Sequence, residues 1–485
     1  MDNDSNSLVC FSSINLSDVI IKNNTANAIV KLESTNGSKN EFLLRAKYDK
    51  EINREILPIL RLAFCMPLLN YGLFSQKFEL GFPLDKHDLT LLKILNEIFS
   101  RDVYVNKILR RRADYIIPKY LPDVDNINPN EANPKAEIFS SNLTINNVMS
   151  NKMDKQSCGI LSSGGKESLL TYGLLKEIGA NVYPLYVNES GGHWRTAISA
   201  YSYHKKSEKN TNKVWTNVDR FYVFMLDHLD FIRKDHRKIH ADTYPIRLCI
   251  FPYYVFLLLP IFIQNNIGNL LIGSEFDDLR SFPNYHGIPH YYGIYDQHQD
   301  FDIIMNNWYS NRIPGLKQWS AVRPISGLIV ERILVNRYHE LAKNQRSCHS
   351  CHLKNNEIIP CGKCSKCLGV LLFLFANKAD PKLMNFKQEH IDNFPNKIKS
   401  SNLRLDQDEK DQSFYLLKNN GIFSHVKPVE HVECIHIHDE IGDQKLVPEQ
   451  FRNKILKIFE EYTNGYCILE NDSWKKIDKK ILSIM

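Results

Sequence analysis

The chain has 485 residues, 43% of them hydrophobic, which is enough for two or three domains with real cores. Its net charge of +6 is too slight over this length to indicate nucleic-acid binding by itself. Residues 1–4 are polar and acidic, unlike a secretory signal or an Arg-rich transit peptide. The longest apolar run, 248–264, contains Pro252 and Pro260 and is shorter than a membrane span. We therefore expect a cytoplasmic protein without membrane segments, in which this run forms a buried helix.

The N-terminal part predicts a small domain of α/β or β-led type over residues 1–135. Alternating residues at 8–11 and 28–32 indicate strands, and Asn36-Gly37 is typical of a hairpin turn. Helical patterns follow at 58–66 and 88–99, and the Pro-, Asn- and Asp-rich stretch 121–134 indicates a linker. A basic cluster in this region is expected to be a solvated helix face rather than an RNA contact, and it consists of Lys107, Arg110, Arg111, Arg112 and Lys119.

The most informative motif is the run Leu-Ser-Ser-Gly-Gly-Lys-Glu-Ser at 161–168. It follows a short apolar strand and precedes an amphipathic helix, which is the arrangement of a phosphate cradle. Glycines bring backbone N–H groups close to an anion, while the serines supply hydroxyls and the lysine a cation. The candidate nucleotide-binding residues of the motif are Ser162, Ser163, Gly164, Gly165, Lys166, Glu167 and Ser168. Lys166 and Glu167 are also candidate catalytic residues.

The region around this motif predicts a parallel sheet with helices between its strands. Candidate strands are 159–161, 182–187, 214–216 and 270–272. Ligands bind beyond the carboxyl ends of such strands, and polar residues follow the strands there. Val187 and Asn188, at the end of the second strand, are candidate cofactor-binding residues at this edge. Gly273 follows the last strand as a candidate phosphate contact, and after it come three acidic residues suited to Mg²⁺, namely Glu275, Asp277 and Asp278.

Arginine side chains are candidates for binding the α-phosphate or an anionic substrate, because a guanidinium group binds both bidentately. The candidates are Arg195, Arg220, Arg247 and Arg323, and we select Arg323 as the catalytic one. Asp296, with Tyr295 and His298, is a candidate for proton transfer.

Five cysteines lie within twenty residues, in the pattern Cys-x2-Cys-x9-Cys-x2-Cys-x2-Cys. This spacing indicates a closed structural zinc site rather than an iron–sulfur cluster or disulfides. Cys361, Cys364 and Cys367 are the first three ligands. Cys348 and Cys351 compete for the fourth position, with His349 or His352 as substitutes.

The Ser-Gly-Gly loop resembles that of the PP-loop ATP pyrophosphatases, although Glu167 stands where that family usually has Asp. Together with the cysteines, the loop is similar to the 7-cyano-7-deazaguanine synthases. It is also similar to the UDP-N-acetylmuramoyl-L-alanyl-L-glutamate epimerases, which have runs like 295–297, 321–326 and 347–349 in the same order. The resemblance covers about 158–381 and implies a PP-loop core at 155–385, which uses ATP, Mg²⁺ and Zn²⁺.

The resemblance implies an enzyme that adenylates a carboxylate or carbonyl oxygen of a small acidic or amino-acid-bearing substrate and releases pyrophosphate. Epimerisation, amidation or ligation would follow. Alternatives are nitrile formation as in the deazaguanine synthases, tRNA modification, and a zinc-stabilised nucleic-acid-binding module without catalysis.

The last part of the chain, 386–485, predicts a small α+β domain. We expect a loop at 406–411 and a helix at 448–462. Cys434, His436 and His438 alternate as on a strand face, but with no further ligand nearby we do not expect a metal there.

Overall fold

The computed structural model describes residues 7–110, 115–144, 148–149, 152–238, 248–276, 284–291, 295–348, 350–354, 357–400, 403, 405–418, 426–437 and 446–478. The chain forms two compact units, each assembled from separate stretches of sequence. Unit 1 comprises 1–153, 214–266 and 279–316, and unit 2 comprises 154–213, 267–278 and 317–485. This division differs from the three consecutive domains expected from the sequence, because the chain passes between the units several times.

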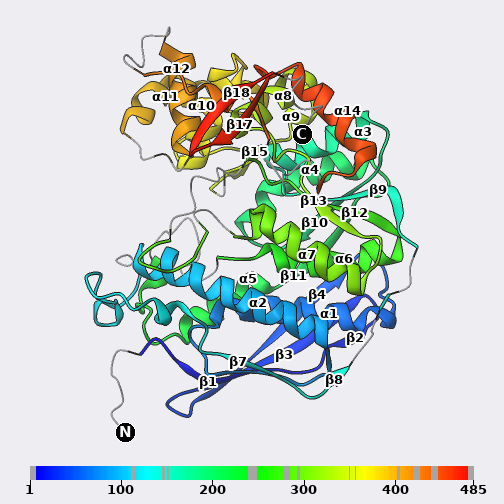
Figure 1. Ribbon diagram of the computed structural model, residues 1–485, viewed down its shortest axis with the longest axis vertical. Helices are drawn as coiled ribbons and strands as arrows, with labels where there is room; N and C mark the ends of the chain where they lie inside the picture. Colours follow the sequence, from blue (N-terminus) through cyan, green and yellow to red (C-terminus); the bar gives the residue numbers. More distant parts are fainter. Residues whose placement is uncertain are drawn as a thin grey trace. The chain divides into compact units, whose positions relative to one another are not determined.

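Unit 1 contains a sheet in the order β11-β4-β3-β1-β5-β7, with β2 paired to β3. Its helices and strands are β1 (Phe11–Leu16), β2 (Ile20–Lys22), β3 (Thr25–Ser34), β4 (Lys39–Tyr48), α1 (Leu57–Cys65), β5 (Lys77–Leu80), β6 (Leu84–Asp85), α2 (Lys86–Val103), β7 (Glu137–Ser140), β8 (Leu143–Thr144), β11 (Asn212–Thr216, of which 214–216 belong here), α5 (Val218–Asp227), α6 (Phe251–Gln264) and α7 (Gln299–Arg312). The short strands β6 and β8 pair separately. Side chains of β3 alternate between buried and more exposed positions, as expected when one sheet face lies against the core. Helices α1 and α2 cover that face (Figure 1).

The hairpin expected at Asn36-Gly37 is present, since β3 and β4 pair antiparallel and Gly37 has a φ of +84°. The helices expected at 58–66 and 88–99 are present as α1 and α2. The apolar run at 248–264 forms the buried helix α6. In the described part of the chain, every helix is too short or too polar to span a bilayer.

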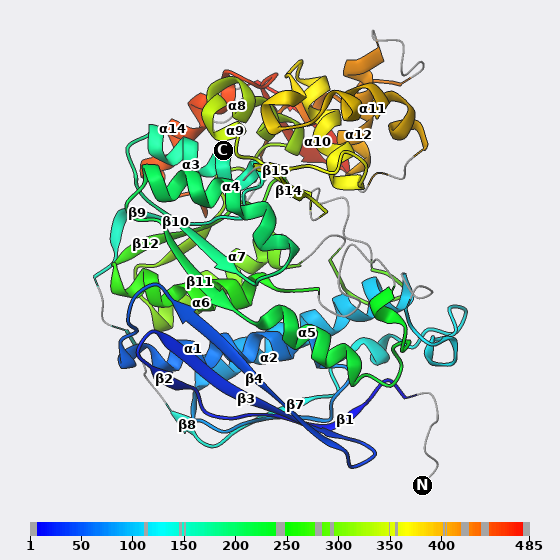
Figure 2. The same ribbon diagram turned by 180° about the vertical axis from the view of Figure 1, so that it is seen from behind.

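Unit 2 contains a parallel sheet in the order β10-β9-β12-β13. Its helices and strands are β9 (Asp154–Leu161), α3 (Lys166–Glu177), β10 (Asn181–Asn188), α4 (Gly192–Ser207), β12 (Ile267–Ile272), β13 (Lys317–Trp319), α8 (Gly327–Arg337), α9 (His339–Ala342), β14 (His352–Lys354), β15 (Glu357–Ile359), α10 (Ser365–Ala376), α11 (Gln388–Ser400), α12 (Gln407–Leu417), β16 (Ile435–Ile437), α14 (Glu449–Glu460), β17 (Tyr466–Glu470) and β18 (Ser473–Ile477). Figure 2 shows α3 and α4 beside β9 and β10. The expected α/β class with a parallel sheet is therefore confirmed.

The strand expected at 214–216 is present as part of β11. In the strand order β11 follows β10 and precedes β4, and residues 214–216 pair antiparallel with β4 of the N-terminal hairpin. Asn217 reinforces this pairing, because its Oδ1 accepts from the Arg45 backbone N–H at 2.7 Å. The antiparallel pairing with β4 was not expected from the sequence, because β4 lies some 170 residues away.

The C-terminal residues share one continuous apolar core with the loop-bearing strand β9. That core joins Ile160 of β9 and Leu371 of α10 to Phe451 and Phe459 of α14. The ring of Phe451 stacks on that of Trp319, with 5.7 Å between the ring centroids. The helix expected at 448–462 is present as α14, whereas the loop expected at 406–411 was wrong.

Residues 407–417 form α12 instead of a loop. Asp406 is its N-cap, and its carboxylate accepts from the backbone N–H groups of Asp408 and Glu409. The acidic run is therefore the first turn of a helix, where negative side chains interact favourably with the helix dipole.

Candidate functional site

Close packing around the loop after β9 requires glycine at two positions, one in the loop itself and one after β12. Gly164 has a φ of +79°, and a Cβ there would lie 3.1 Å from the carbonyl oxygen of Thr196 in α4. A Cβ on Gly273, after β12, would lie 2.9 Å from Cβ of Glu167 and 3.1 Å from the backbone nitrogen of Ser168. The absence of these two Cβ atoms lets the end of β12 and the side of α4 approach the loop closely.

Hydroxyl groups within the loop hold its shape. Ser163 Oγ accepts from the backbone N–H of Gly165 at 3.3 Å, and Ser168 Oγ accepts from that of Ser163 at 3.4 Å. The Ser168 hydroxyl donates to the carbonyl of Gly165 at 3.2 Å. From the segment before the cysteines, the backbone N–H of Arg346 donates to the carbonyl of Gly164 at 2.9 Å. The loop is thus fixed before any ligand binds.

Lys166, the first residue of α3, lies between two glutamates. Its Nζ contacts Oε1 of Glu167 and lies 2.7 Å from Oε2 of Glu275. Burial disfavours the charge on Lys166, but the two carboxylates outweigh it and raise its pKa well above the usual value. Burial also raises the pKa of Glu275, although Lys166 opposes that shift.

Two further buried carboxyl groups complete this cluster, and the sequence analysis missed both. Glu331 of α8 accepts from Nε2 of Gln345 at 2.9 Å, and Glu409 of α12 accepts from the backbone N–H of Gly327. Burial raises the pKa of Glu331 to about 7 and that of Glu409 to about 8. The positive charge of Lys166 lowers the pKa of both groups and so opposes the effect of burial. We call Lys166, Glu167, Glu275, Glu331 and Glu409 the loop cluster.

A sequence signal existed for one of these two residues. Glu331 is the single acid in the apolar helix 327–335 and is completely buried. An acid inside an apolar helical run indicates a buried and therefore functional or paired group. Glu409 gave no comparable signal, because its neighbours in the sequence are mostly acids and amides.

Several other predicted residues follow the parallel strands of unit 2. Asn188 ends β10, and its Oδ1 accepts from the backbone N–H of Ser190 at 2.8 Å. The half-buried Val187 precedes it, and the buried Arg323 follows β13. Because β10, β9, β12 and β13 are parallel neighbours, their carboxyl ends meet at one edge, where the loop 162–168 also lies.

Asp296 lies in unit 1, apart from the loop cluster's unit. Its Oδ2 accepts from the backbone N–H groups of Ile250 and Phe251, both at 2.7 Å. Asp296 therefore caps the start of α6. Other predicted residues lie outside the described ones, namely Asp277, Asp278, Arg247, Arg111, Arg112, His349 and His438.

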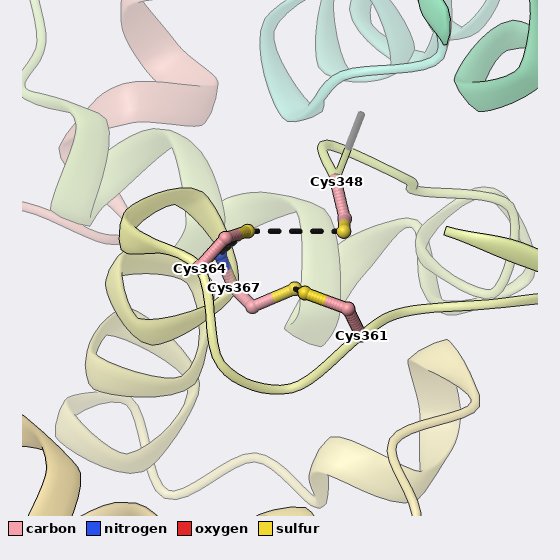
Figure 3. A group of neighbouring side chains, drawn as sticks. All are labelled: Cys348, Cys361, Cys364 and Cys367. Atoms are coloured by element: carbon pink, nitrogen blue, oxygen red, sulfur yellow. Dashed lines mark hydrogen bonds between the residues drawn. The ribbon is translucent and has the colours of Figure 1, made fainter. Parts of the chain in front are cut away.

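Four cysteine side chains converge in unit 2 (Figure 3), and these are Cys348, Cys361, Cys364 and Cys367. Their sulfur atoms all lie within 4.8 Å of one another. The Sγ atoms of Cys361 and Cys367 are 3.8 Å apart, and those of Cys364 and Cys348 are 3.7 Å apart. A tetrahedral zinc ion with Zn–S bonds of about 2.3 Å places its sulfurs about 3.8 Å apart, so the thiols fit zinc.

The surrounding backbone explains which cysteines converge. Gly362 has a φ of +65°, and a Cβ there would collide with the ring of His390. Cys364 is the N-cap of α10, and its Sγ accepts from the backbone N–H of Cys367 at 3.4 Å. Hydrogen bonding from Cys348 lowers the pKa of Cys361, and it lowers that of Cys364 to about 7. Hydrogen bonding within the group raises the pKa values of Cys348 and Cys367, so these shifts favour the thiolate at Cys361 and Cys364 alone.

Cys351 does not belong to this group of sulfur atoms in the part of the chain that the structure describes. Its carbonyl oxygen accepts instead from Nη1 of Arg195 at 3.3 Å, and His352 is exposed. Cys348 is therefore the fourth member of the cluster.

Comparison of the chain with protein-family models, with curated proteins and with solved structures found no match.

Proposed function

We propose that the protein is a Mg²⁺-dependent, AMP-forming enzyme of PP-loop type, which adenylates an oxygen of a small acidic or amino-acid-bearing substrate. The observation that carries this proposal is the loop 162–168. It leaves a parallel strand at the carboxyl edge of the sheet, is fixed by its own hydroxyls, and opens a helix whose first residue is a half-buried lysine. A helix N-terminus with glycines before it is suited to bind phosphate.

In the proposed reaction a carboxylate or carbonyl oxygen of the substrate attacks the α-phosphorus of ATP. The bond from that phosphorus to the bridging oxygen breaks, and pyrophosphate leaves with the electron pair. The N-terminus of α3 and Lys166 stabilise the charge that develops on the departing group. Arg323, which follows β13 at the same edge, is the candidate for the charge at the α-phosphate.

The charges of the loop cluster explain why Mg²⁺ would be needed. Lys166 is already paired with Glu167 and Glu275, so the triphosphate would meet carboxylates as well as a cation. Mg²⁺ prefers oxygen ligands and bridges phosphates, and Glu167 and Glu275 are the residues that would hold it. The ion would remove this repulsion and release Lys166 to the phosphates.

The four-cysteine cluster would hold zinc in a structural role. Two residues before Cys348, the backbone N–H of Arg346 binds the carbonyl of Gly164 in the loop. The folded cysteine segment would therefore brace the phosphate loop, and it needs no part in the chemistry.

The test is product analysis of ATP labelled at the α-phosphate, incubated with the full-length protein, Mg²⁺ and fractions of a small-metabolite extract. We expect AMP and pyrophosphate that depend on one fraction. Lys166→Met should reduce AMP formation by about a hundredfold or more. Lys176→Met changes an exposed lysine of the same helix and serves as the matched control.

Other outcomes would replace the proposal. Stimulation by a deazapurine carboxylate or by tRNA would favour the nitrile-forming or tRNA-modifying alternative. Formation of ADP, or unchanged AMP formation in the Lys166→Met variant, would contradict the role of the loop. Absence of ATP binding together with RNA binding that weakens steeply with salt would favour the zinc-stabilised binding module.

A further inference from the structure

Unit 1 contains a cavity of about 460 Å³ that no part of the proposed reaction uses. It lies where α2 ends, beside the segment 284–291 and the start of α7. The helix α2 continues at this place into a π-helical turn, Tyr104–Leu109, and such turns are frequent at functional sites. The polar residues that line the cavity include Arg101, Asp102, His290, Tyr291, Gln299 and Asp300. A volume of this size is typical of sites for small metabolites.

Three buried atoms of this lining have no hydrogen-bond partner among the residues that the structure describes. They are Oδ2 of Asp102, Nε2 of His290 and Oε1 of Gln299. Buried polar atoms are nearly always paired in folded proteins, so three of them around one cavity indicate that a ligand supplies the partners.

All three unpartnered atoms are hydrogen-bond acceptors when Asp102 is ionised. Oδ1 of Asp102 already accepts from the backbone N–H of Tyr291 at 2.9 Å, which leaves Oδ2 for another donor. Nδ1 of His290 lies 3.0 Å from the carbonyl oxygen of Ile288, so Nδ1 carries the proton and Nε2 is an acceptor. An amide oxygen such as Oε1 of Gln299 only accepts. The ligand must therefore bring several donors.

The charges of the lining favour a cation over an anion. Asp102 is completely buried; this burial, together with the nearby Asp296, raises its pKa to about 8, and a cation bound beside it would favour the ionised form. Asp300 accepts from the hydroxyl of Tyr291 at 2.7 Å and adds a second carboxylate. Arg101 is already paired, with its guanidinium 2.5 Å from Glu97 and 3.3 Å from Oδ1 of Asn133. Among the described lining residues, an anionic ligand would thus meet no unpaired arginine or lysine.

We propose that this cavity binds a small primary amine in its ammonium form, whose N–H groups donate to Asp102, His290 and Gln299. An ammonium group carries three donors and one positive charge, which matches three acceptors beside a carboxyl group. This inference rests on unit 1 alone and does not depend on the proposed adenylation.

The test is ligand binding to the full-length protein, measured by thermal unfolding and by calorimetric titration. The probes are matched pairs of an amine and its hydroxyl analogue: ethanolamine with ethylene glycol, putrescine with 1,4-butanediol, and glucosamine with glucose. At about 10 mM, at least one amine should raise Tm, and its hydroxyl analogue should not. Acetate and inorganic phosphate should have no effect.

Asp102→Asn is the informative variant, because its amide oxygen can still accept from the backbone of Tyr291 while the charge is lost. We expect about a tenfold or greater loss of amine affinity. Asp125→Asn removes a charge from an exposed position of the same unit and should bind as the wild type does. The proposal is overturned if no amine binds, if each alcohol binds as well as its amine, or if Asp102→Asn binds unchanged. Because the amine and alcohol pairs are compared on the wild type, the test stands even if the variant does not fold.

Discussion

The cysteine cluster and the loop cluster belong to the same unit but are assembled in opposite ways. The four cysteines come from one stretch of twenty residues, and two of their sulfur–sulfur distances, 3.7 and 3.8 Å, already match a tetrahedral ion. The loop cluster brings Lys166 and Glu167 together with Glu275, Glu331 and Glu409 from three distant segments. The cysteine cluster is already arranged for a metal ion. In the loop cluster Lys166 is paired with Glu167 and Glu275, so these side chains would have to rearrange before Lys166 could contact a phosphate.

The difference shows what each site contributes to the molecule. The free energy of metal binding stabilises the segment that brings the four thiols together, so the ion should support the fold. Buried carboxyl groups around a single lysine cost free energy and are retained in proteins mainly where they serve function. The loop cluster is therefore the place where we expect chemistry.

The largest effect should follow loss of the metal. Cys364→Ser, or a strong chelator, should remove bound zinc and destabilise unit 2 by several kcal/mol, because metal binding is part of its folding free energy. Metal content by mass spectrometry and thermal unfolding by circular dichroism measure both. Cys351→Ser is the matched control and should keep one zinc per chain. A metal-free protein with an unchanged Tm would contradict the structural role of the metal.

Close packing around the loop should give the next effect. Gly273→Ala places a Cβ against Cβ of Glu167 and the backbone of Ser168, so the end of β12 or the start of α3 must shift. We expect a loss of about 1–3 kcal/mol in the free energy of unfolding, measured with denaturant. Gly369→Ala in α10 is the control, because its Cβ would have ordinary contacts of 3.5–3.7 Å with Leu405. Equal stability of the two variants would contradict the packing described here.

The buried acids predict a particular pH dependence. The pKa values of Glu331 and Glu409, about 7 and about 8, are raised above those of the unfolded chain, so the folded state binds more protons. Their contribution to the stability of the folded state is fully present below the pKa values of the unfolded chain. It is lost as pH rises through the folded-state values of about 7 and about 8. The free energy of unfolding should thus decrease between about pH 5 and pH 8, by roughly 1–3 kcal/mol.

Glu409→Gln should flatten this pH dependence, because the amide carries no charge at any pH. Glu389→Gln, at an exposed position, should leave the slope as in the wild type. A slope that Glu409→Gln does not change would show that Glu409 does not titrate as described.

The smallest effect should come from the helix that delivers Glu409. Asp406→Ala removes the N-cap of α12 and should cost about 1 kcal/mol in denaturant unfolding. Asp411→Ala lies within the helix and should cost less. A neutral Asp406→Ala variant would contradict the capping role.

The sequence identified the cysteine cluster more completely than the loop cluster, for a physical reason. Cysteine spacing is local, so it identified Cys361, Cys364 and Cys367, while the choice between Cys348 and Cys351 depended on the fold of the preceding turn. The glycine loop and its strands were likewise predicted from local patterns. Glu409 could not be assigned, because its position depends on α12 packing beside Gly327, about eighty residues away in sequence. The pairing of β11 with β4 was missed for the same reason.

The most direct test of the central claim is an equilibrium titration of the full-length protein with ATP, with and without Mg²⁺. We expect that ATP binds with Mg²⁺, that binding weakens by about tenfold or more without it, and that Lys166→Met abolishes binding while Lys176→Met does not. Binding of ATP that depends on neither Mg²⁺ nor Lys166, or no binding at all, would contradict the assignment of 162–168 as a phosphate loop.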